Sequence, residues 1–159
     1  MILILTQSGR TGKNRLIAED CATIINHFSS IEPDIKNFDE VSNDALKGYD
    51  KIVMIVPEWN RSIPFTLKQM IDNAEWPSLL KNKDIYLIGT SGGIGGNMLG
   101  ISHLTDILHY CGSNVCHSKV YVSGLETFDR DSELAKVSTE MISNLMKELC
   151  STYTNDQVI

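Results

Sequence analysis

Short apolar runs alternate along this chain with segments of helical periodicity, and this alternation restricts the fold more than any other feature. Strands that are separated by helices pair in parallel through right-handed crossovers, which leaves a sheet covered on both faces. The length of 159 residues suits one such domain. The predicted strands lie within residues 2–5, 31–38, 51–56, 84–89 and 114–122.

The segments between these runs predict the helices of a three-layer α/β domain. One of them, at 41–49, has room for one or two turns only. The predicted fold is flavodoxin-like, with a five-stranded parallel sheet in the order 2-1-3-4-5. We assign 1–150 to this domain and 151–159 to a C-terminal tail. The longer predicted helices span 14–28, 65–74, 98–111 and 131–149.

Composition and charge exclude several classes of function. The net charge of −6 disfavours nucleic acid as a partner, since proteins that bind it carry a basic face. No run of about 18 apolar residues predicts a membrane span, and residues 1–5 are too short for a signal peptide, so we expect a cytoplasmic protein. Cys111 and Cys116 lie near His103, His109 and His117, but their spacing matches no zinc pattern, and packing is favoured over a metal site.

Three loops follow predicted strands, and parallel strands bring such loops to one edge of the sheet. The first, SGRTGKN at 8–14, combines hydroxyls, glycines and two cations before a helix, which favours a phosphate site. It is not a Walker loop, because Gln7 stands where the first glycine is required and Asn14 follows Lys13. A polar turn that begins a helix is the alternative.

The second and third loops have the composition of a site for a planar ligand. PEWNRSIP at 57–64 places an aromatic ring and an amide at a strand end, although Trp59 covering the core is an equal alternative. GTSGGIGG at 89–96 removes side chains so that backbone can approach another group closely. It lacks the G-x-G-x-x-G pattern of dinucleotide-binding folds. A glycine loop without a ligand is the alternative here.

These motifs resemble those of the NADPH-dependent FMN reductase family, which includes flavin-containing quinone, azo-dye and chromate reductases on a flavodoxin-like fold. PEWNRSIP, followed by LK at 67–68 and ID at 71–72, is similar to the family pattern P-E-[YW]-N-x-S-[IP]-P…LK…ID. SGGIGG at 91–96 is similar to the family segment S-x-G-x-x-G-G. The similarity extends in order over residues 2–122.

The resemblance implies three groups of residues that contact FMN. The first would hold the phosphate: Ser8, Arg10, Thr11, Gly12, Lys13 and Asn14. The second would line the isoalloxazine and ribityl portion: Pro57, Glu58, Trp59 and Asn60. The third would pass its backbone along the pyrimidine side: Ser91, Gly92, Gly93 and Gly95.

The chain departs from the family pattern in two places. The usual first loop is S-x-R-x-x-S-x-N, whereas here Arg10 and Asn14 stand one residue closer and Lys13 occupies the hydroxyl position. Thr11 and Gly12 are instead similar to the T-G-x-T loop of flavodoxins. The connection at 38–50 is also shorter than is usual in the family, in a region that helps to wall the site.

The resemblance implies an FMN-dependent oxidoreductase that takes electrons from NADPH or NADH and passes them to a quinone or similar small-molecule acceptor. We expect no catalytic acid or nucleophile, because the flavin carries the chemistry. The alternatives are a flavodoxin-like electron carrier that does not use NAD(P)H, and a relative that has lost its flavin. A homodimer or homotetramer is also implied. The candidate interface side chains are Phe65, Met70, Trp76 and Leu99.

Overall fold

The computed structural model describes residues 1–7, 12–125 and 132–154. It contains a five-stranded sheet in the order β2-β1-β3-β4-β5, in which every pair of neighbours is parallel. The predicted fold class and strand order are therefore confirmed. The strands are β1 (Ile2–Thr6), β2 (Asp34–Asn37), β3 (Lys51–Pro57), β4 (Asp84–Thr90) and β5 (Asn114–Val122).

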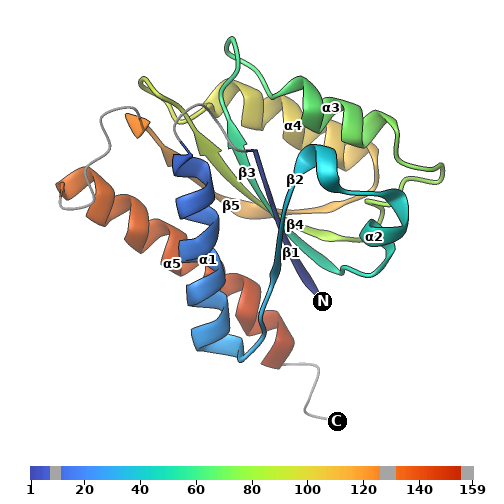
Figure 1. Cartoon of the computed structure of the whole chain (residues 1–159), viewed down its shortest axis with the longest axis horizontal. Coiled ribbons are helices and arrows are strands. Elements are labelled where there is room, and N and C mark those ends of the chain that lie inside the picture. The colour runs from blue at the N-terminus through green and yellow to red at the C-terminus, as the bar shows by residue number, and fades with distance from the viewer. Residues whose placement is uncertain (8–11, 126–131, 155–159) are drawn as a thin grey trace.

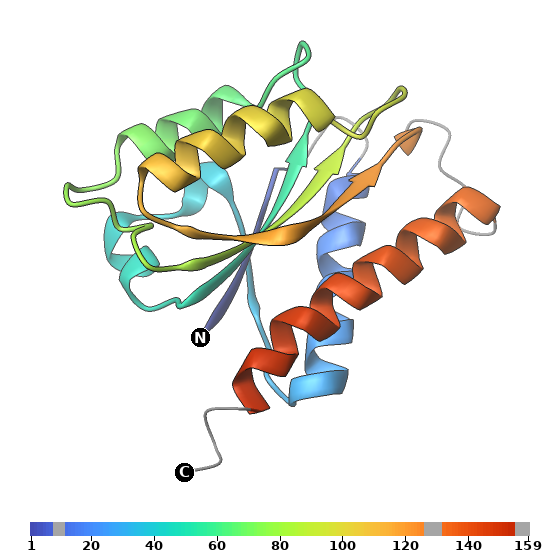
Figure 2. The ribbon, with the colours of Figure 1, turned by 180° about the vertical axis from the view of Figure 1, so that it is seen from behind.

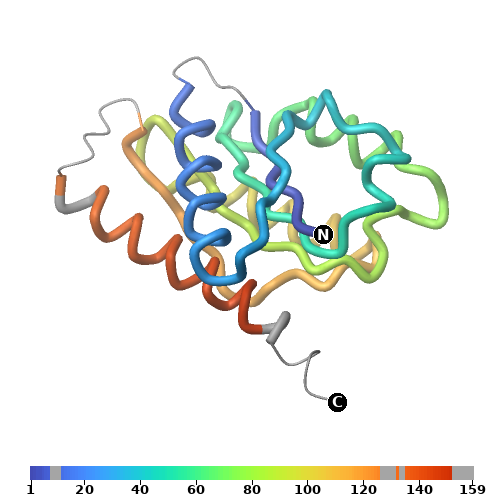
Figure 3. The backbone as a smooth tube through the Cα atoms, turned by 60° about the horizontal axis from the view of Figure 1, so that its bottom comes forward, coloured from blue at the N-terminus to red at the C-terminus, as the bar shows by residue number. Residues whose placement is uncertain are grey.

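Helices cover both faces of the sheet (Figure 1). α1 and α5 pack against each other on one face (Figure 3), and α3 and α4 lie on the opposite face (Figure 2). The 38–50 connection holds a 3-10 turn, η1, and one short helix, as expected from its length. The helices are α1 (Lys13–Ser29), η1 (Phe38–Glu40), α2 (Asn43–Lys47), α3 (Phe65–Asp72), α4 (Met98–Tyr110) and α5 (Glu133–Thr154).

Alternate residues of the strands supply two separate cores, as expected for a sheet buried on both faces. In β1, Ile2 and Ile4 face the α1 and α5 layer, whereas Leu3 and Leu5 face the α3 and α4 layer. β3 alternates in the same way through residues 52–56, and all of its residues are buried. The continuous apolar runs in the sequence thus arise from double-sided burial.

The boundary predicted between domain and tail falls inside α5. This helix continues to Thr154, whereas the sequence pattern placed its end at Leu149. Leu149 and Cys150 are both buried, and neither glycine nor proline follows them to end the helix. Residues 151–154 are therefore helical, and 155–159 lie outside the described residues.

The carboxyl ends of the strands lie at one edge of the sheet, where the loops after β3 and β4 project beyond the arrowheads (Figure 2). This edge contains the described part of the three loops with unusual composition. No helix among the described residues is both long and apolar enough to cross a membrane.

Candidate functional site

The loop after β3 forms a tight turn that presents aromatic side chains. Trp59 N–H donates to the Ser62 carbonyl and Ser62 N–H donates to the Trp59 carbonyl, each at 3.0 Å. Asn60 and Arg61 between them both have positive φ, 50° and 64°, as in a two-residue hairpin turn of type I′. Trp59 is 39% exposed, and its ring lies 5.9 Å from that of Phe65, which is 64% exposed. The turn therefore offers exposed apolar ring surface to a ligand.

The glycine loop after β4 is held in shape by two serines. The Ser91 hydroxyl accepts from Gly96 N–H at 3.0 Å and donates to the Gly93 carbonyl at 2.9 Å. Ser123, which follows β5, accepts from Gly95 N–H at 3.0 Å. The φ of Gly95 is 102°, a value that side chains rarely allow, so glycine is required at this position. The loop is thus ordered by bonds that leave its outer surface bare.

The outer surface of the glycine loop presents free hydrogen-bond donors. Gly92, Gly93 and Ile94 are exposed, and their amide N–H groups have no partner within the described part of the chain. A Cβ atom added at Gly93 or Gly95 would meet nothing within 4 Å. Backbone amides that no side chain shields can donate hydrogen bonds to the carbonyl and ring-nitrogen acceptors of a heterocycle.

The first loop is described only in part, since Ser8, Arg10 and Thr11 lie outside the described residues. Gly12 precedes α1 with φ 67°, and the helix has neither a side-chain cap nor an acidic residue in its first turn. Among the described residues no side chain caps the amino end of this 17-residue helix, and such an end favours an anion. Lys13 extends away from Gly12, and its ammonium group donates to the Leu125 carbonyl at 2.5 Å.

Asn14 lies inside the molecule, where it connects β1, α1 and β4. It is 5% exposed, its Nδ2 donates to the Gln7 carbonyl at 3.4 Å, and its Oδ1 accepts from the Thr90 hydroxyl at 2.9 Å. The Gln7 side chain is held in turn by the Thr66 hydroxyl at 2.7 Å. The carboxamide of Asn14 thus fixes the start of α1, and its role toward a phosphate stays a prediction.

Two further contacts connect the loops after β3 and β4. Glu58 N–H donates to the Thr90 carbonyl at 2.7 Å. Asn97 Nδ2 donates to the carbonyls of Val56 and Pro57 at 3.3 and 3.2 Å. The predicted contact residues Pro57, Glu58 and Trp59 are thereby brought beside the glycine loop.

Sequence reasoning did not identify Thr90, Asn97 or Gln7, although each one organises this edge. An asparagine directly after two glycines is a signal for Asn97, since asparagine tolerates the left-handed region that a helix start here requires. Nothing in the local sequence indicates Gln7 or Thr90, because their partners are distant along the chain.

Two titratable side chains of β5 have raised pKa values. Burial raises the pKa of Tyr121, whose backbone lies 2.7 Å from where a Cβ of Gly96 would stand. Burial, followed by a hydrogen bond to Glu148, raises the pKa of the Cys116 thiol. Neither group is poised to supply a negative charge to the site at neutral pH.

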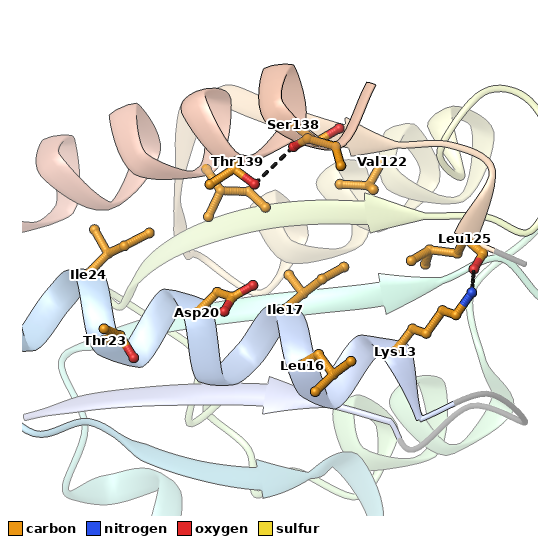
Figure 4. Close-up of a pocket in the computed structure, with 12 residues that line it drawn as sticks. Lys13, Leu16, Ile17, Asp20, Thr23, Ile24, Val122, Leu125, Ser138 and Thr139 are labelled. Atoms are coloured by element: carbon orange, nitrogen blue, oxygen red, sulfur yellow. Dashed lines mark hydrogen bonds between the residues drawn. The ribbon is translucent and has the colours of Figure 1, made fainter. Parts of the chain in front are cut away.

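A cavity of about 420 Å³ lies between α1 and α5 (Figure 4). Its wall is mainly apolar and includes Leu16, Ile17, Val122 and Ile142. Of the predicted flavin contacts that the structure describes, Lys13 alone lines it, and the residues of the turn after β3 and of the glycine loop do not.

The described residues of the strand-end loops fit FMN. Open amide donors, bare glycine backbone and an exposed aromatic pair suit a flavin ring, and the uncapped amino end of α1 suits its phosphate. Gly12, where an added Cβ would also meet nothing within 4 Å, leaves that amino end accessible.

Comparison with solved structures shows the same fold in proteins of low sequence identity. An oxidoreductase from Corynebacterium diphtheriae has 17% identity and a TM-score of 0.79, with 94% of each chain covered. Flavodoxin 2 of Bacillus cereus has 17% identity and a TM-score of 0.74, with 95% of this chain and 98% of that chain covered. The NAD(P)H:(acceptor) oxidoreductase FerB of Paracoccus denitrificans has 18% identity and a TM-score of 0.67, with 92% and 94% covered.

No curated protein sequence matches the chain significantly. The sequence model of the NADPH-dependent FMN reductase family does match, over residues 21–127, which is more than half of the chain. This match includes the turn after β3 and the whole glycine loop. The chain therefore belongs to the NADPH-dependent FMN reductase family, and it is a flavodoxin-like, FMN-dependent oxidoreductase.

Proposed function

We propose that the protein is an NAD(P)H-dependent reductase that passes electrons from a nicotinamide donor through FMN to a quinone or similar small acceptor. The observation that carries this proposal is that the amides of Gly92, Gly93 and Ile94 have no partner among the described residues. The loop that bears them is hydrogen-bonded to the segment that leads into the exposed Trp59. Family membership supports the nicotinamide donor.

The chain itself would bind and orient the reactants. Bound FMN supplies the redox chemistry, by accepting hydride and releasing electrons. The glycine-loop amides would donate to the pyrimidine edge of the flavin, and the type I′ turn would pack Trp59 and Asn60 against the ring. The open amino end of α1 would hold the phosphate, together with Ser8, Arg10, Thr11 and Gly12.

An absorbance experiment tests the proposal. The purified protein is incubated with FMN, desalted, and recorded before and after anaerobic addition of NADPH or NADH. We expect a retained flavin band that bleaches within seconds with at least one nucleotide. A protein that retains no flavin would contradict the cofactor assignment.

The second candidate is a flavodoxin-like electron carrier that exchanges electrons with protein partners. The flavodoxins among the structural neighbours favour it, including the one from Bacillus cereus. A retained flavin band that neither nucleotide bleaches would support the carrier and contradict the reductase.

The phosphate assignment has its own test in Arg10→Ala. If Arg10 makes a charged hydrogen bond to the FMN phosphate, its loss weakens binding by about 1–3 kcal/mol. Riboflavin, which lacks the phosphate, is the control ligand, and its dissociation constant should not change. An unchanged FMN dissociation constant would place the phosphate elsewhere.

We further propose that the protein associates as a homodimer or homotetramer through exposed apolar side chains of α3, α4 and the segments that adjoin them. Phe65, Trp76 and Leu99 are 64%, 79% and 58% exposed, and Ile94 on the glycine loop is 98% exposed. Family membership and these exposed apolar side chains together support the proposal. Met70 is excluded from this surface, because it is 8% exposed and packs in the core under α3.

A further inference from the structure

Asn97 combines three features that are costly for a residue at the start of a helix. It directly precedes α4 with φ 62°, in the left-handed region. It is fully buried although it carries a carboxamide. Its Oδ1 has no hydrogen-bond partner among the described residues. Strained and unsatisfied groups persist where the surrounding structure holds them for a purpose.

Helix capping does not explain the side chain. An asparagine at this position usually accepts a hydrogen bond from the second or third amide of the helix. The Asn97 carboxamide makes no such bond to α4. Its Nδ2 instead reaches the carbonyls of Val56 and Pro57, about 40 residues away in sequence, at 3.3 and 3.2 Å.

The surrounding backbone leaves room for this arrangement. A Cβ added at Gly100, one turn into α4, would lie 2.2 Å from Asn97 Oδ1. On the other side Gly96 has φ 54° and approaches the backbone of Tyr121. The carboxamide thus lies between the first turn of α4 and the end of β3. A residue larger than glycine at position 100 would displace it.

We propose that Asn97 is a positioning residue of the flavin site, which sets the separation between the turn after β3 and the glycine loop. The inference rests on the proposed function, since it takes these two loops to be the ones that contact the ring. Asn97 acts at the base of both loops: its backbone ends the glycine loop, and its side chain holds Pro57, the last residue before the turn.

Three variants test the proposal. Asn97→Gly keeps the left-handed backbone without strain and removes the whole side chain, including the carboxamide. Asn97→Asp keeps the shape but removes the two N–H donors that face Val56 and Pro57. Gly100→Ala retains Asn97 and displaces its side chain. The matched control is Ser113→Ala, because the buried Ser113 hydroxyl also donates to a backbone carbonyl, that of Leu80 at 2.9 Å, before the amino end of β5.

We expect Asn97→Gly and Gly100→Ala to raise the FMN dissociation constant at least tenfold, and Ser113→Ala to leave it within twofold. The affinities for oxidised and reduced FMN should change unequally. A tenfold change in their ratio shifts the two-electron midpoint potential by about 30 mV. A residue that only stabilises the fold would lower the free energy of unfolding without moving this potential.

Amide exchange in the FMN-free protein separates this inference from the proposed function. The N–H groups of Glu58 and Ser62 should exchange faster in Asn97→Gly than in the wild type. Their exchange rates should not change in Ser113→Ala. Should the wild type bind no FMN, the proposed function fails, while faster exchange would still support the coupling of the two loops. Asn97 variants with wild-type exchange, or with a wild-type FMN affinity and potential, would overturn the positioning role.

Discussion

At Gly89 the absence of a side chain allows the glycine loop and α4 to pack closely against β4. A Cβ at this position would lie 2.2 Å from the Gly96 carbonyl oxygen and 2.8 Å from Ile101 Cγ1. Its φ lies outside the left-handed region, so space is the reason for glycine here. The glycine loop can fold back onto β4 only because this position has no side chain.

Gly89→Ala should therefore destabilise the protein by about 1–3 kcal/mol, the usual cost of overpacking. The control is Gly93→Ala in the same loop, where the added Cβ meets nothing within 4 Å. We expect the control to remain within about 0.5 kcal/mol of wild type. Urea unfolding of the two variants gives the comparison, and equal stabilities would show that the loop moves away at no cost.

Glu40 gives a second prediction at this scale, which concerns pH. Hydrogen bonds from the backbone and side chain of Asn37 hold the pKa of Glu40 below its ordinary value of 4.5. The ionised carboxylate is therefore favoured by folding. Its contribution is complete above pH 4.5 and is lost as the pH falls through the lower pKa of the folded state.

Glu40→Gln removes this titration and keeps a side-chain acceptor. The difference in unfolding free energy between wild type and variant should be constant above pH 4.5 and shrink below it. Urea unfolding across this range measures the difference. A constant difference down to the lowest pH at which the protein folds would contradict the role of the carboxylate.

At the scale of elements, a short chain of hydrogen bonds connects the ends of β1 and β4 to the start of α1. The Thr90 hydroxyl donates to Asn14 Oδ1 at 2.9 Å, and Asn14 Nδ2 reaches the Gln7 carbonyl. These groups are buried, so a lost partner cannot be replaced easily by water. The carboxyl edge is thus fixed by polar contacts above the apolar core.

Thr90→Val retains the shape of the side chain and removes the donor, which leaves Asn14 Oδ1 buried without this partner. We expect a loss of about 1–3 kcal/mol in the free energy of unfolding. Thr90→Ser keeps the hydroxyl and should lose less. If the Thr90→Val variant proved as stable as the wild type, the hydrogen bond between Thr90 and Asn14 would contribute nothing to the packing of α1 on the sheet.

At the scale of the whole molecule, the exposed apolar side chains of α3, α4 and the segments that adjoin them support the proposed self-association. Light scattering at micromolar concentration should give the mass of a dimer or tetramer for the wild type. The double variant Phe65→Ser, Trp76→Ser should be a monomer, because both of these side chains are exposed in the isolated chain. Tyr110→Ser is the control, since Tyr110 is 82% exposed at the far end of α4. A monomeric wild type would overturn the assembly proposal.

Local signals in the sequence were sufficient for the elements of the fold. Apolar runs at 51–56 and 84–89 predicted β3 and β4 nearly to the residue, because strands buried on both faces are apolar along most of their length. The end of α5 was missed because its last turns contain neither glycine nor proline, so that helix and tail have the same local composition. The FMN motifs were likewise visible, since they lie within single loops.

The sequence by itself determined the fold class, the edge at which the loops gather and the family, because apolar runs, helical segments and loop motifs can each be identified within short stretches of the chain. The strand order followed from the fold class. Only the tertiary structure decided what each loop residue does there. Asn14 and Lys13, expected at a phosphate, make contacts with Thr90 and Leu125, and Asn97 holds the end of β3. These contacts join residues 40 to 112 positions apart, and the position of a hydrogen-bond partner at that separation is set by the packing of the sheet rather than by any local pattern.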